Sequence, residues 1–408
     1  MTITFLSNYI NHHQIPFCDA CCRELGEDFR FIQTQPMEQE RIDMGWDTKA
    51  VTLPYVLCLY EEEERCLRLI LESDILLAGW TGREDLIEER MKRGRATIRI
   101  SERIYREGQW KAVSPRGLIH KYREHTRYRN QDAYLLCAGA YVPSDFHIIR
   151  AYPGKMYRFG YFPRTVHYTR EQWEGLKPSG GMLEIVWAAR FIPLKHPEFM
   201  IRLAVYLKEK RRDWAGGKEG FDSFRIHMVG GGEMEADLKE QAEKAGVEEN
   251  LVFHGFLSPG GVRRIMEGCH IHVFTSDYQE GWGAVMNEAM NSGCGEVANV
   301  QAGAVPYLIR HGENGLVYPD GDFEKMARAV LYLASHPGEC RKMGRAAYET
   351  ITKLWNAEHA AAELIRFCKG VLEGEAVPAK EGPLSPAPVI APGKMYEAMM
   401  RDTDFDGF

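Results

Sequence analysis

The sequence predicts an α/β protein with two doubly wound domains, each built on a parallel β-sheet with helices on both faces. Short apolar segments alternate with amphipathic helical patterns along the chain, which is typical of parallel sheets. A polar stretch rich in glycine and proline, residues 168–181, interrupts this alternation. The length of 408 residues also exceeds that of one ordinary domain. We expect the two domains to face each other across a cleft, with ligands at the carboxyl ends of the strands.

The apolar runs and helical patterns give the expected elements. In the first half we expect strands at residues 3–6, 29–32, 74–78, 96–100 and 134–138, and helices at residues 52–71 and 83–92. In the second half we expect strands at residues 183–189, 224–229, 251–253, 271–274 and 296–300, and helices at residues 233–245 and 356–371.

The same patterns suggest domain limits. We expect a first domain over residues 1–170, a linker over 171–181 and a second domain over 182–355. A helix follows over residues 356–372. The last segment, residues 373–408, is rich in proline and small residues, so we expect it to be extended or disordered, with a short helix at its end.

Composition excludes several classes of protein. Hydrophobic residues make up 45% and charged residues 27%, which is ordinary for a globular protein. A formal net charge of −7 argues against a nucleic-acid partner. We find no apolar run of the ~18 residues that a membrane span needs, and no secretory signal at the start. Ten cysteines without such a signal favour free thiols in a cytoplasmic protein.

A cysteine cluster near the start has two interpretations. Cys18, Cys21 and Cys22 follow His12 and His13, so a metal site is one of them. The other is the inner face of a helix, because the cysteines recur at positions i, i+3 and i+4 and free cysteine behaves as a small buried hydrophobe. We favour the second, since no further spaced pair of ligands follows, and we expect no metal in this protein.

The most informative stretch is YQEGWGAVMNEAMNSG. Glu280 and Glu288 lie eight residues apart there, and the apolar strand 271–274 precedes them. Gly281 and Gly283 open a turn before a helical pattern. A strand, glycine turn and helix in this order direct backbone N–H groups and the positive helix end at an anion, with phosphate as the obvious candidate. The two carboxylates can address two parts of one ligand, because they are about two helical turns apart.

Two other segments carry groups suited to phosphate. Arg190 and Lys195 follow the expected strand 183–189, and side chains of these types bind phosphate oxygens. Gly230 and Gly231 follow another strand and precede a helix, which suits close approach of the backbone to a nucleotide. Solvated Arg and Lys side chains are the plain alternative. The third glycine of a dinucleotide fingerprint is lacking, so a dehydrogenase is not favoured.

These segments together resemble a known family. The E-x7-E spacing with EGWG at its front is similar to the signature of family four glycosyltransferases, which have the GT-B fold. WAARFIPLKHPE, FRIHMVGGGEMEADL and LVFHGFLSPGGV resemble three other segments of that family, in the same order. The resemblance covers about residues 182–309. It implies a GT-B fold whose last helix crosses back to the first domain.

The resemblance also implies roles for residues. Arg190 and Lys195 would neutralise the diphosphate leaving group, Glu280 would contact the donor sugar, and Glu288 would bind the ribose. Phe256 would border the nucleoside, although packing in the core is an equal alternative for it. Glu280 could also favour the following helix through the helix dipole. The full set expected to bind the nucleotide sugar is Gly230, Gly231, Phe256, Gly281, Trp282, Gly283, Ala284, Val285 and Glu288.

The implied function is a retaining, metal-independent transfer of a sugar from a UDP- or GDP-linked donor to a hydroxyl acceptor. No cofactor is expected, because the nucleotide sugar is a substrate. Synthesis of a cell-surface polysaccharide or a lipid-linked glycan is the favoured context. The alternatives are a natural-product or protein acceptor, or a non-catalytic subunit that binds nucleotide sugar beside an active enzyme. The sugar, base, acceptor and linkage are not identified by the sequence.

The chain departs from the family pattern in both halves. The turn after the first strand is SNYINHHQ rather than glycine-rich, so His12, His13 and Glu102 are candidates for the acceptor side, with solvated polar turns as the alternative. Glu296 stands where the family commonly has an apolar residue, and Tyr307 stands where it has a glutamate. These departures argue against assuming a standard donor or acceptor.

Residues 91–130 form a basic stretch. It contains twelve Lys or Arg and three Glu, a net charge of +9, with aromatic residues interleaved. Such a surface suits peripheral contact with an anionic membrane at its inner face, and a lipid-linked acceptor. An anionic sugar could bind it equally, and an exposed helix with internal salt bridges is a further alternative.

Overall fold

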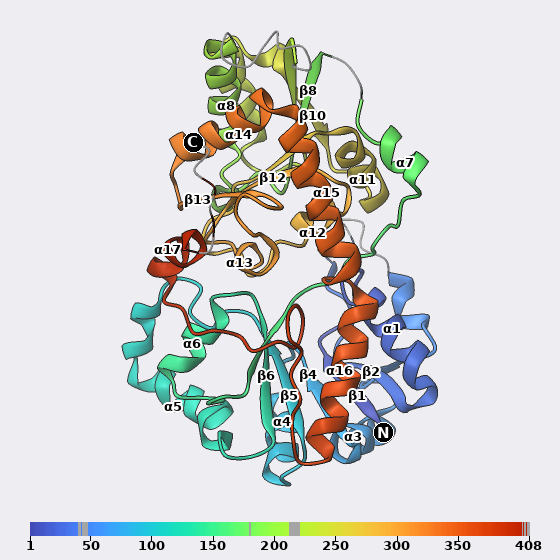
Figure 1. The fold of residues 1–408 in the computed structure, drawn as a ribbon. Coiled ribbons are helices and arrows are strands. Elements are labelled where there is room, and N and C mark those ends of the chain that lie inside the picture. Colours follow the sequence, from blue (N-terminus) through green and yellow to red (C-terminus); the bar gives the residue numbers. More distant parts are fainter. Residues whose placement is uncertain are drawn as a thin grey trace. The chain divides into compact units, whose positions relative to one another are not determined.

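The computed structural model describes residues 1–39, 42, 48–178, 181–211, 221–401, 403 and 405. Its chain forms two compact units (Figure 1). The first comprises residues 1–164 and 354–391, and the second comprises residues 165–353 and 392–408. No helix among the described residues is both long and apolar enough to span a membrane.

The first unit contains a seven-stranded sheet in the order β3-β2-β1-β4-β5-β6-β7, and all of its neighbouring strands are parallel. The strands are β1 (Ile3–Ser7), β2 (Phe29–Gln33), β3 (Val56–Cys58), β4 (Ile75–Ala78), β5 (Thr97–Ser101), β6 (Ala133–Ala138) and β7 (Met156–Phe159). The α-helices are α1 (Ile15–Leu25), α3 (Glu63–Glu72), α4 (Glu84–Lys92), α5 (Pro115–Glu124), α6 (Val142–Ile148) and α16 (Ala357–Leu372). Short 3₁₀ turns are η1 (Gly26–Asp28), η2 (Thr48–Thr52), η3 (Gln109–Val113) and η4 (Thr126–Tyr128).

The second unit contains a six-stranded parallel sheet in the order β10-β9-β8-β11-β12-β13. Its strands are β8 (Met182–Ala188), β9 (Ser223–Val229), β10 (Leu251–Gly255), β11 (Ile271–Phe274), β12 (Gly295–Asn299) and β13 (Leu316–Tyr318). Its α-helices are α7 (Arg170–Gly175), α8 (Glu198–Glu209), α10 (Glu235–Lys244), α11 (Pro259–Gly268), α12 (Ala284–Asn291), α13 (Val305–Leu308), α14 (Phe323–Ser335), α15 (Pro337–Lys353) and α17 (Met395–Met400). Its 3₁₀ turns are η5 (Pro193–Lys195), η6 (Glu248–Asn250) and η7 (Pro392–Lys394).

The last long helix belongs to the first unit. The N-cap of helix α16 is Asn356, whose side chain accepts a hydrogen bond from the His359 N–H. This bond satisfies a backbone N–H of the first helical turn, and the helix therefore starts directly after the turn at residues 354–355. Its apolar face packs on α1 (Figure 1). Cys18 and Cys21 of α1 are fully buried and Cys22 is partly buried, so the core interpretation of the cysteine cluster is confirmed.

Three expectations about elements were wrong. The helix expected at residues 52–71 is interrupted by strand β3 and begins only at α3. Strands β7 and β13 were not expected, because runs of three or four residues carry too little pattern. The polar break contains helix α7, whose Thr169 and Gln172 side chains form a capping box.

The segment after α16 packs on the first unit. Leu384 is fully buried, its N–H donates to the Arg158 carbonyl at 2.8 Å, and the Arg158 N–H donates to the Ser385 carbonyl at 2.8 Å. Residues 373–391 are irregular, with turns and bends at residues 373–374 and 380–385, and the short helix α17 follows. Residues 179, 180, 402, 404 and 406–408, parts of the expected linker and tail, lie outside the described residues. The domain limits expected from the sequence stay a prediction.

Candidate functional site

Two of the expected catalytic residues meet in the second unit. Strands β8 and β11 are neighbours, so the turns after their carboxyl ends lie at one edge of the sheet. Lys195 ends the 3₁₀ turn after β8, and its Nζ forms an ion pair with the Glu280 carboxylate in the turn after β11. Both side chains are mostly buried, at 14% and 15% exposed. Arg190, the third expected residue, is exposed just past β8.

The turn before α12 needs glycine at one position. Gly283 has φ of +92° and caps α12, and a Cβ there would lie 2.4 Å from Cζ of Phe274. The Trp282 indole is buried and donates to Asn287 Oδ1 at 2.9 Å, so only the backbone of Trp282 is suited to a ligand. Glu280 is paired with Lys195, and its alternative role, favouring α12 through the helix dipole, is compatible with this pair and stays a prediction.

Glu288 lies on α12 with its side chain largely removed from water. Burial raises the pKa of its carboxyl to about 7, and the charges of Arg263 and His272 oppose that effect. Carboxyl groups that are costly to ionise are common at ligand-binding sites, and Glu288 is such a group beyond a glycine turn. Its expected role as the ribose acceptor stays a prediction.

The glycine turn after β9 is shaped by its neighbours. Gly230 has φ of +124°, and a Cβ there would lie 2.0 Å from the Ala189 carbonyl oxygen. A Cβ on Gly231 would lie 2.9 Å from Cε2 of Phe256. The Gly230 N–H donates to the Gly255 carbonyl at 2.9 Å, which places Phe256 beside this turn. Phe256 is 68% exposed, so the alternative that it packs in the core is wrong.

The two departures from the family pattern lie inside the second unit. Glu296 and His272 are fully buried and form a pair, with Oε2 and Nδ1 2.7 Å apart. Burial raises the pKa of Glu296, and the His272 charge opposes this. Tyr307 is nearly buried, with its ring centroid 6.3 Å from that of Trp282. Both departures are therefore buried side chains, and Tyr307 lies next to the Trp282 ring.

The expected acceptor-side residues gather in the first unit. The rings of His12 and His13 lie 3.9 Å apart, and the His13 ring stacks on Tyr161 at 6.1 Å. The Tyr161 hydroxyl donates to Glu102, which also pairs with Arg106. Burial lowers the pKa of His12, and burial with the nearby His12 charge lowers the pKa of His13 to about 3. We call these five residues the His–Tyr–Glu cluster.

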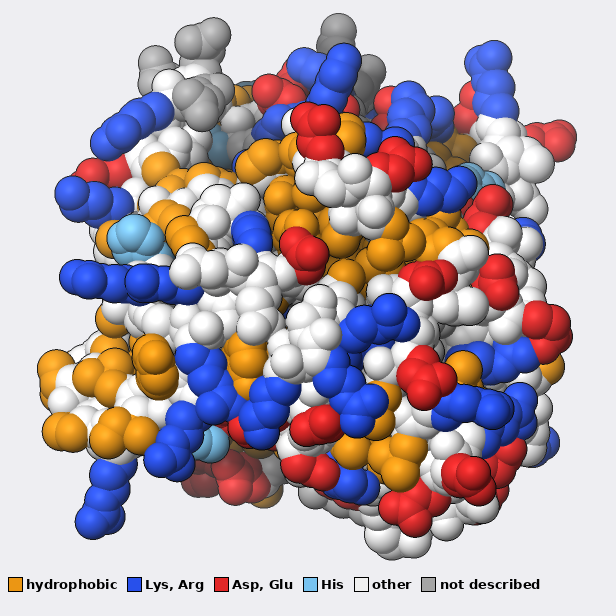
Figure 2. All heavy atoms as spheres, turned by 90° about the horizontal axis from the view of Figure 1, so that it is seen from below, with side chains coloured by type: hydrophobic (Ala, Val, Ile, Leu, Met, Phe, Trp, Pro, Cys, Tyr) orange, Lys and Arg blue, Asp and Glu red, His pale blue; other side chains and the backbone are white. Residues whose placement is uncertain are grey.

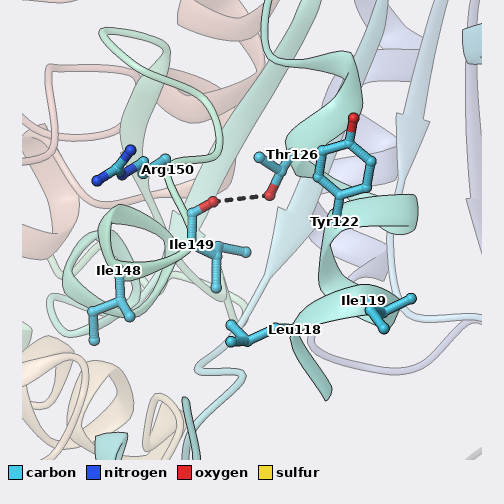
Figure 3. Close-up of a pocket in the computed structure, with 7 residues that line it drawn as sticks. All are labelled: Leu118, Ile119, Tyr122, Thr126, Ile148, Ile149 and Arg150. Carbon is cyan, nitrogen blue, oxygen red and sulfur yellow. Dashed lines mark hydrogen bonds between the residues drawn. The ribbon is translucent and has the colours of Figure 1, made fainter. Parts of the chain in front are cut away.

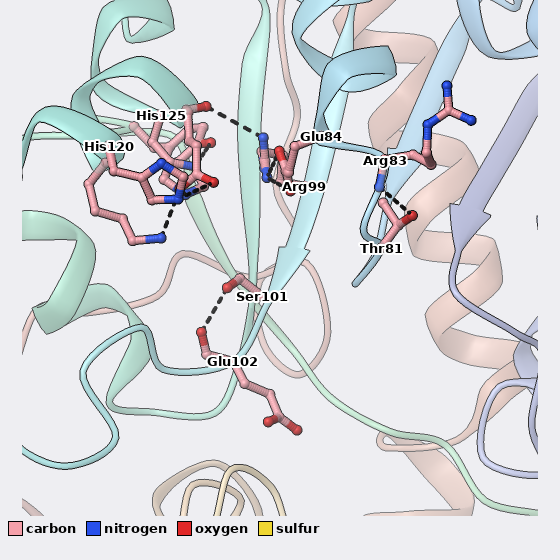
Figure 4. Close-up of polar contacts among 11 residues, drawn as sticks. Thr81, Arg83, Glu84, Arg99, Ser101, Glu102, His120 and His125 are labelled. Atoms are coloured by element: carbon pink, nitrogen blue, oxygen red, sulfur yellow. Dashed lines mark hydrogen bonds and ion pairs between the residues drawn. The ribbon is translucent and has the colours of Figure 1, made fainter. Parts of the chain in front are cut away.

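The cluster lies at the carboxyl ends of β1, β5 and β7. Tyr161 and Arg106 were missed from the sequence, and the signal that could have found Tyr161 is strand β7, which was also missed. Figure 4 shows the Glu102 carboxylate directed away from the nearby pair of Glu84 and Arg99. Arg99 is buried and donates from Nη2 to both Glu84 carboxylate oxygens at 2.7 and 2.8 Å, so its side chain is engaged inside the unit and is not a candidate for binding a ligand.

Residues 171–350 match the family model described as "Glycosyl transferases group 1". This part of the chain is similar to group 1 glycosyltransferases. Curated glycosyltransferases also match part of the chain, and the resemblance to family four enzymes is therefore confirmed.

Two curated relatives illustrate the extent of the match. The putative glycosyltransferase EpsD of Bacillus subtilis (strain 168) is 29% identical over 173 residues, 42% of this chain and 42% of EpsD. A GDP-mannose-dependent alpha-(1-6)-phosphatidylinositol monomannoside mannosyltransferase of Mycobacterium tuberculosis is 24% identical over 193 residues, 46% of this chain and 47% of that protein. The chain thus aligns with less than half of the length of each relative.

Solved structures share the fold over nearly the whole chain. Anabaena Alr3699/HepE in complex with UDP has a TM-score of 0.62 at 14% identity, covering 90% of this chain and 100% of that one. The apo form of the lipopolysaccharide outer core galactosyltransferase WaaB has a TM-score of 0.62 at 13% identity, with the same coverage. The predicted GT-B fold class is confirmed, including the α16 helix of the first unit.

Proposed function

We propose that the protein is a retaining glycosyltransferase that moves a sugar from a UDP- or GDP-linked donor to a hydroxyl acceptor without a metal. The observation that carries the proposal is the meeting of Lys195 and Glu280 at the carboxyl ends of adjacent strands, inside the domain that matches the family. The favoured acceptors are a cell-surface polysaccharide or a lipid-linked glycan.

The chemistry follows from the side chains at the rim. Departure of a nucleoside diphosphate builds negative charge, and fixed cations at that place lower the barrier. Arg190 is exposed beyond β8 and offers planar paired donors, and Lys195 offers a compact charge. Glu280 holds the Lys195 ammonium in place and would exchange part of this contact for hydroxyls of the donor sugar. Glu288, which follows Gly283 along the chain, would accept hydrogen bonds from the ribose hydroxyls.

Removal of Arg190 tests the proposal. We expect Arg190→Ala to lose about 3 kcal/mol of transition-state stabilisation, roughly 150-fold in kcat/KM. The assay is release of UDP or GDP from a panel of nucleotide sugars, with water or small alcohols as acceptors. Arg328→Ala, an exposed arginine on α14 of the same unit, is the matched control and should keep full activity. A chain that binds donor and never turns over would instead support the non-catalytic subunit, and an Arg190 variant within twofold of wild type would remove that side chain from the mechanism.

Contact with an anionic membrane is part of the proposal, but on a smaller surface than residues 91–130. Much of the charge in that stretch is paired within the unit: Arg103 with buried Asp145, Arg127 and Lys92 with Glu88. Other pairs join Arg93 to Glu89, Arg99 to Glu84, Arg106 to Glu102, Lys111 to Glu107 and Lys121 to Glu124. The interpretation of the whole stretch as an open basic surface is therefore wrong.

The remaining surface combines apolar and basic side chains. Leu118, Ile119 and Tyr122 of α5 line a pocket of about 360 Å³ with Ile148, the last residue of α6, and Arg150 (Figure 3). Those four apolar side chains are 39–56% exposed. Figure 2 shows apolar side chains gathered at the left of the face seen from below, with Lys and Arg side chains beside them.

Charge complementarity favours an anionic bilayer as the occupant of this surface. Within the described part of the chain, Arg116, Arg123, Arg129 and Arg150 are exposed and form no ion pair. Each basic side chain near an anionic membrane contributes about 1 kcal/mol, and exposed apolar side chains add to this by entering the interface.

Vesicle binding tests the membrane contact. We expect sedimentation with vesicles containing phosphatidylglycerol at low salt, a loss at high salt, and little binding to neutral vesicles. Ile119→Glu should abolish it. The control Val389→Glu changes another exposed apolar residue of the same unit, 45% exposed, and should bind as wild type does. Absence from anionic vesicles at low salt, or equal loss in both variants, would contradict membrane contact.

A further inference from the structure

His196 lies between the two turns that carry Lys195 and Glu280, and it has an unusual backbone. It follows Lys195 directly and has φ of 49° and ψ of 52°. This left-handed conformation costs a residue with a side chain about 1 kcal/mol and is ordinarily left to glycine. A non-glycine residue there is a reason to ask what its side chain does.

The imidazole ring touches two carboxylates from different segments. Its Nδ1 lies 2.9 Å from Glu198 Oε1 at the start of α8, and its Nε2 lies 3.6 Å from Asp277 Oδ2 in the turn after β11. Nδ1 is within hydrogen-bond distance of Glu198 and Nε2 is within ion-pair distance of Asp277, which suits a ring that carries a proton on each nitrogen. The carboxylates raise the pKa of His196 to about 10, with Asp277 as the larger influence. The ring is therefore positively charged at neutral pH.

Asp277 is itself part of the turn that ends in Glu280. The Asp277 N–H donates to the Leu194 carbonyl at 3.0 Å, and the Glu280 N–H donates to the Asp277 carbonyl at 3.0 Å. Thr275 donates its hydroxyl proton to the Lys195 carbonyl and receives the Trp187 indole N–H at 2.7 Å. His196 adds a charged side-chain link to these backbone links.

We propose that His196 is a positioning residue that joins the Lys195 turn to the Glu280 turn through Asp277. This inference rests on the proposed transfer reaction and assigns a specific task within it. Lys195 must meet the leaving diphosphate while Glu280 meets the sugar, so the separation between the two turns sets how well both contacts form at once. Loss of the ring leaves both side chains present but less well placed. A misplacement of about 1 Å can cost about 100-fold in rate.

The charged groups near the His196 ring come from its own segment and from the turn after β11. From its own side the ring faces Glu198, and across the turn it faces Asp277 and the Lys195–Glu280 pair. The Phe199 ring packs on it at 5.4 Å, with the Arg202 guanidinium on that phenyl ring at 5.2 Å. Two carboxylates adjoin the ring directly, and the nearby cations are held by other partners.

The first experiment removes the ring without straining the backbone. His196→Gly accepts the left-handed conformation, so we expect the melting temperature to stay close to that of wild type. We expect kcat to fall about 10- to 100-fold with little change in the donor KM. Added imidazole should restore part of the lost kcat, since the ring is 31% exposed and its site is open to solvent. His336→Gly, at an exposed histidine after α14, is the control and should change neither value.

A second measurement needs no activity. In protein with ¹⁵N-labelled histidine, the His196 ring should stay protonated up to about pH 9 in wild type, and Asp277→Asn should move its titration toward the ordinary range of histidine. A ring that is neutral at pH 7.5, or a His196→Gly enzyme with unchanged kcat, would overturn the positioning role. A wild-type chain that turns over no donor contradicts the proposed function instead, and the ring titration then still decides whether the link exists.

Discussion

Glu288→Gln should make the protein more stable at alkaline pH, although it removes a residue assigned to the donor. The pKa of this carboxyl is about 7 in the folded chain against an ordinary value of 4.5. The folded state therefore holds the proton more tightly than the unfolded chain does. The carboxyl costs nothing below the ordinary value, costs increasingly more as pH rises from 4.5 to 7, and carries its full cost above pH 7.

The magnitude follows from the difference between these two values. At about 1.36 kcal/mol for each pH unit, it corresponds to about 3 kcal/mol above pH 7. Because the side chain keeps some contact with solvent, screening reduces this, and we expect about 2 kcal/mol at pH 8 and about 0.5 kcal/mol at pH 5. Glutamine keeps the shape and removes the charge, so Glu288→Gln should gain these amounts.

Urea unfolding at pH 5 and pH 8, followed by tryptophan fluorescence, measures the gain. Glu243→Gln, at an exposed position of α10, is the matched control and should unfold as wild type does at both values of pH. The nucleotide should stabilise the Glu288 variant less than wild type in a thermal shift, since the ribose acceptor is weakened. A Glu288 variant that is no more stable than the control at pH 8 would refute the burial argument.

Three further outcomes can be checked. Donor turnover should persist in excess EDTA, because side-chain cations replace the metal; activity that returns only with a divalent cation would contradict the proposed chemistry. Gly283→Ala should destabilise the second unit by about 2 kcal/mol or more, measured by urea unfolding, because its Cβ would lie 2.4 Å from Phe274 at a positive φ; an unchanged midpoint would mean that the turn relaxes. Glu296→Ala should cost about 3 kcal/mol, since it leaves buried His272 without its carboxylate; thermal unfolding within 1 °C of wild type would show that the pair is not needed for stability.

The sequence was most informative where pattern and chemistry coincide. Strand β11, the glycine turn and α12 follow in the order that the apolar run, the glycines and the helical pattern predict. Glu280 and Glu288 could be predicted as site residues because Glu280 lies in that turn and Glu288 lies on the helix after it, where both can contact one ligand. Lys195 could be paired with this segment only through the family resemblance, since 85 residues separate it from Glu280.

The sequence was least informative where a partner is distant along the chain. The basic stretch reads as +9, but Arg103 pairs with a carboxylate 42 residues away and Arg127 with one 39 residues away. The amino-acid composition of a stretch does not show which of its charged residues pair with residues far along the chain. Short strands were missed for a different reason: β3 has only three residues, which carry too little pattern to be told from the neighbouring helix.

Features that lower stability or restrict the sequence gather at one edge of the second sheet, and their location indicates where the site lies. His196 adopts a left-handed conformation after β8, Gly230 and Gly283 have positive φ after β9 and β11, and Glu288 carries a carboxyl that is expensive to ionise. Each lowers stability or restricts the sequence, and none is needed to build a parallel sheet. Selection for stability alone would remove such features, so their shared location favours a function at this edge. In the first unit, Gly139 has a positive φ directly after β6, and the non-glycine residues with positive φ, Arg150, Tyr152 and Leu384, lie away from the carboxyl ends of its strands. No residue of the His–Tyr–Glu cluster has a positive φ. We therefore expect substitutions at the second unit's edge to trade stability against donor turnover, and substitutions in the cluster to change acceptor use without a gain in stability.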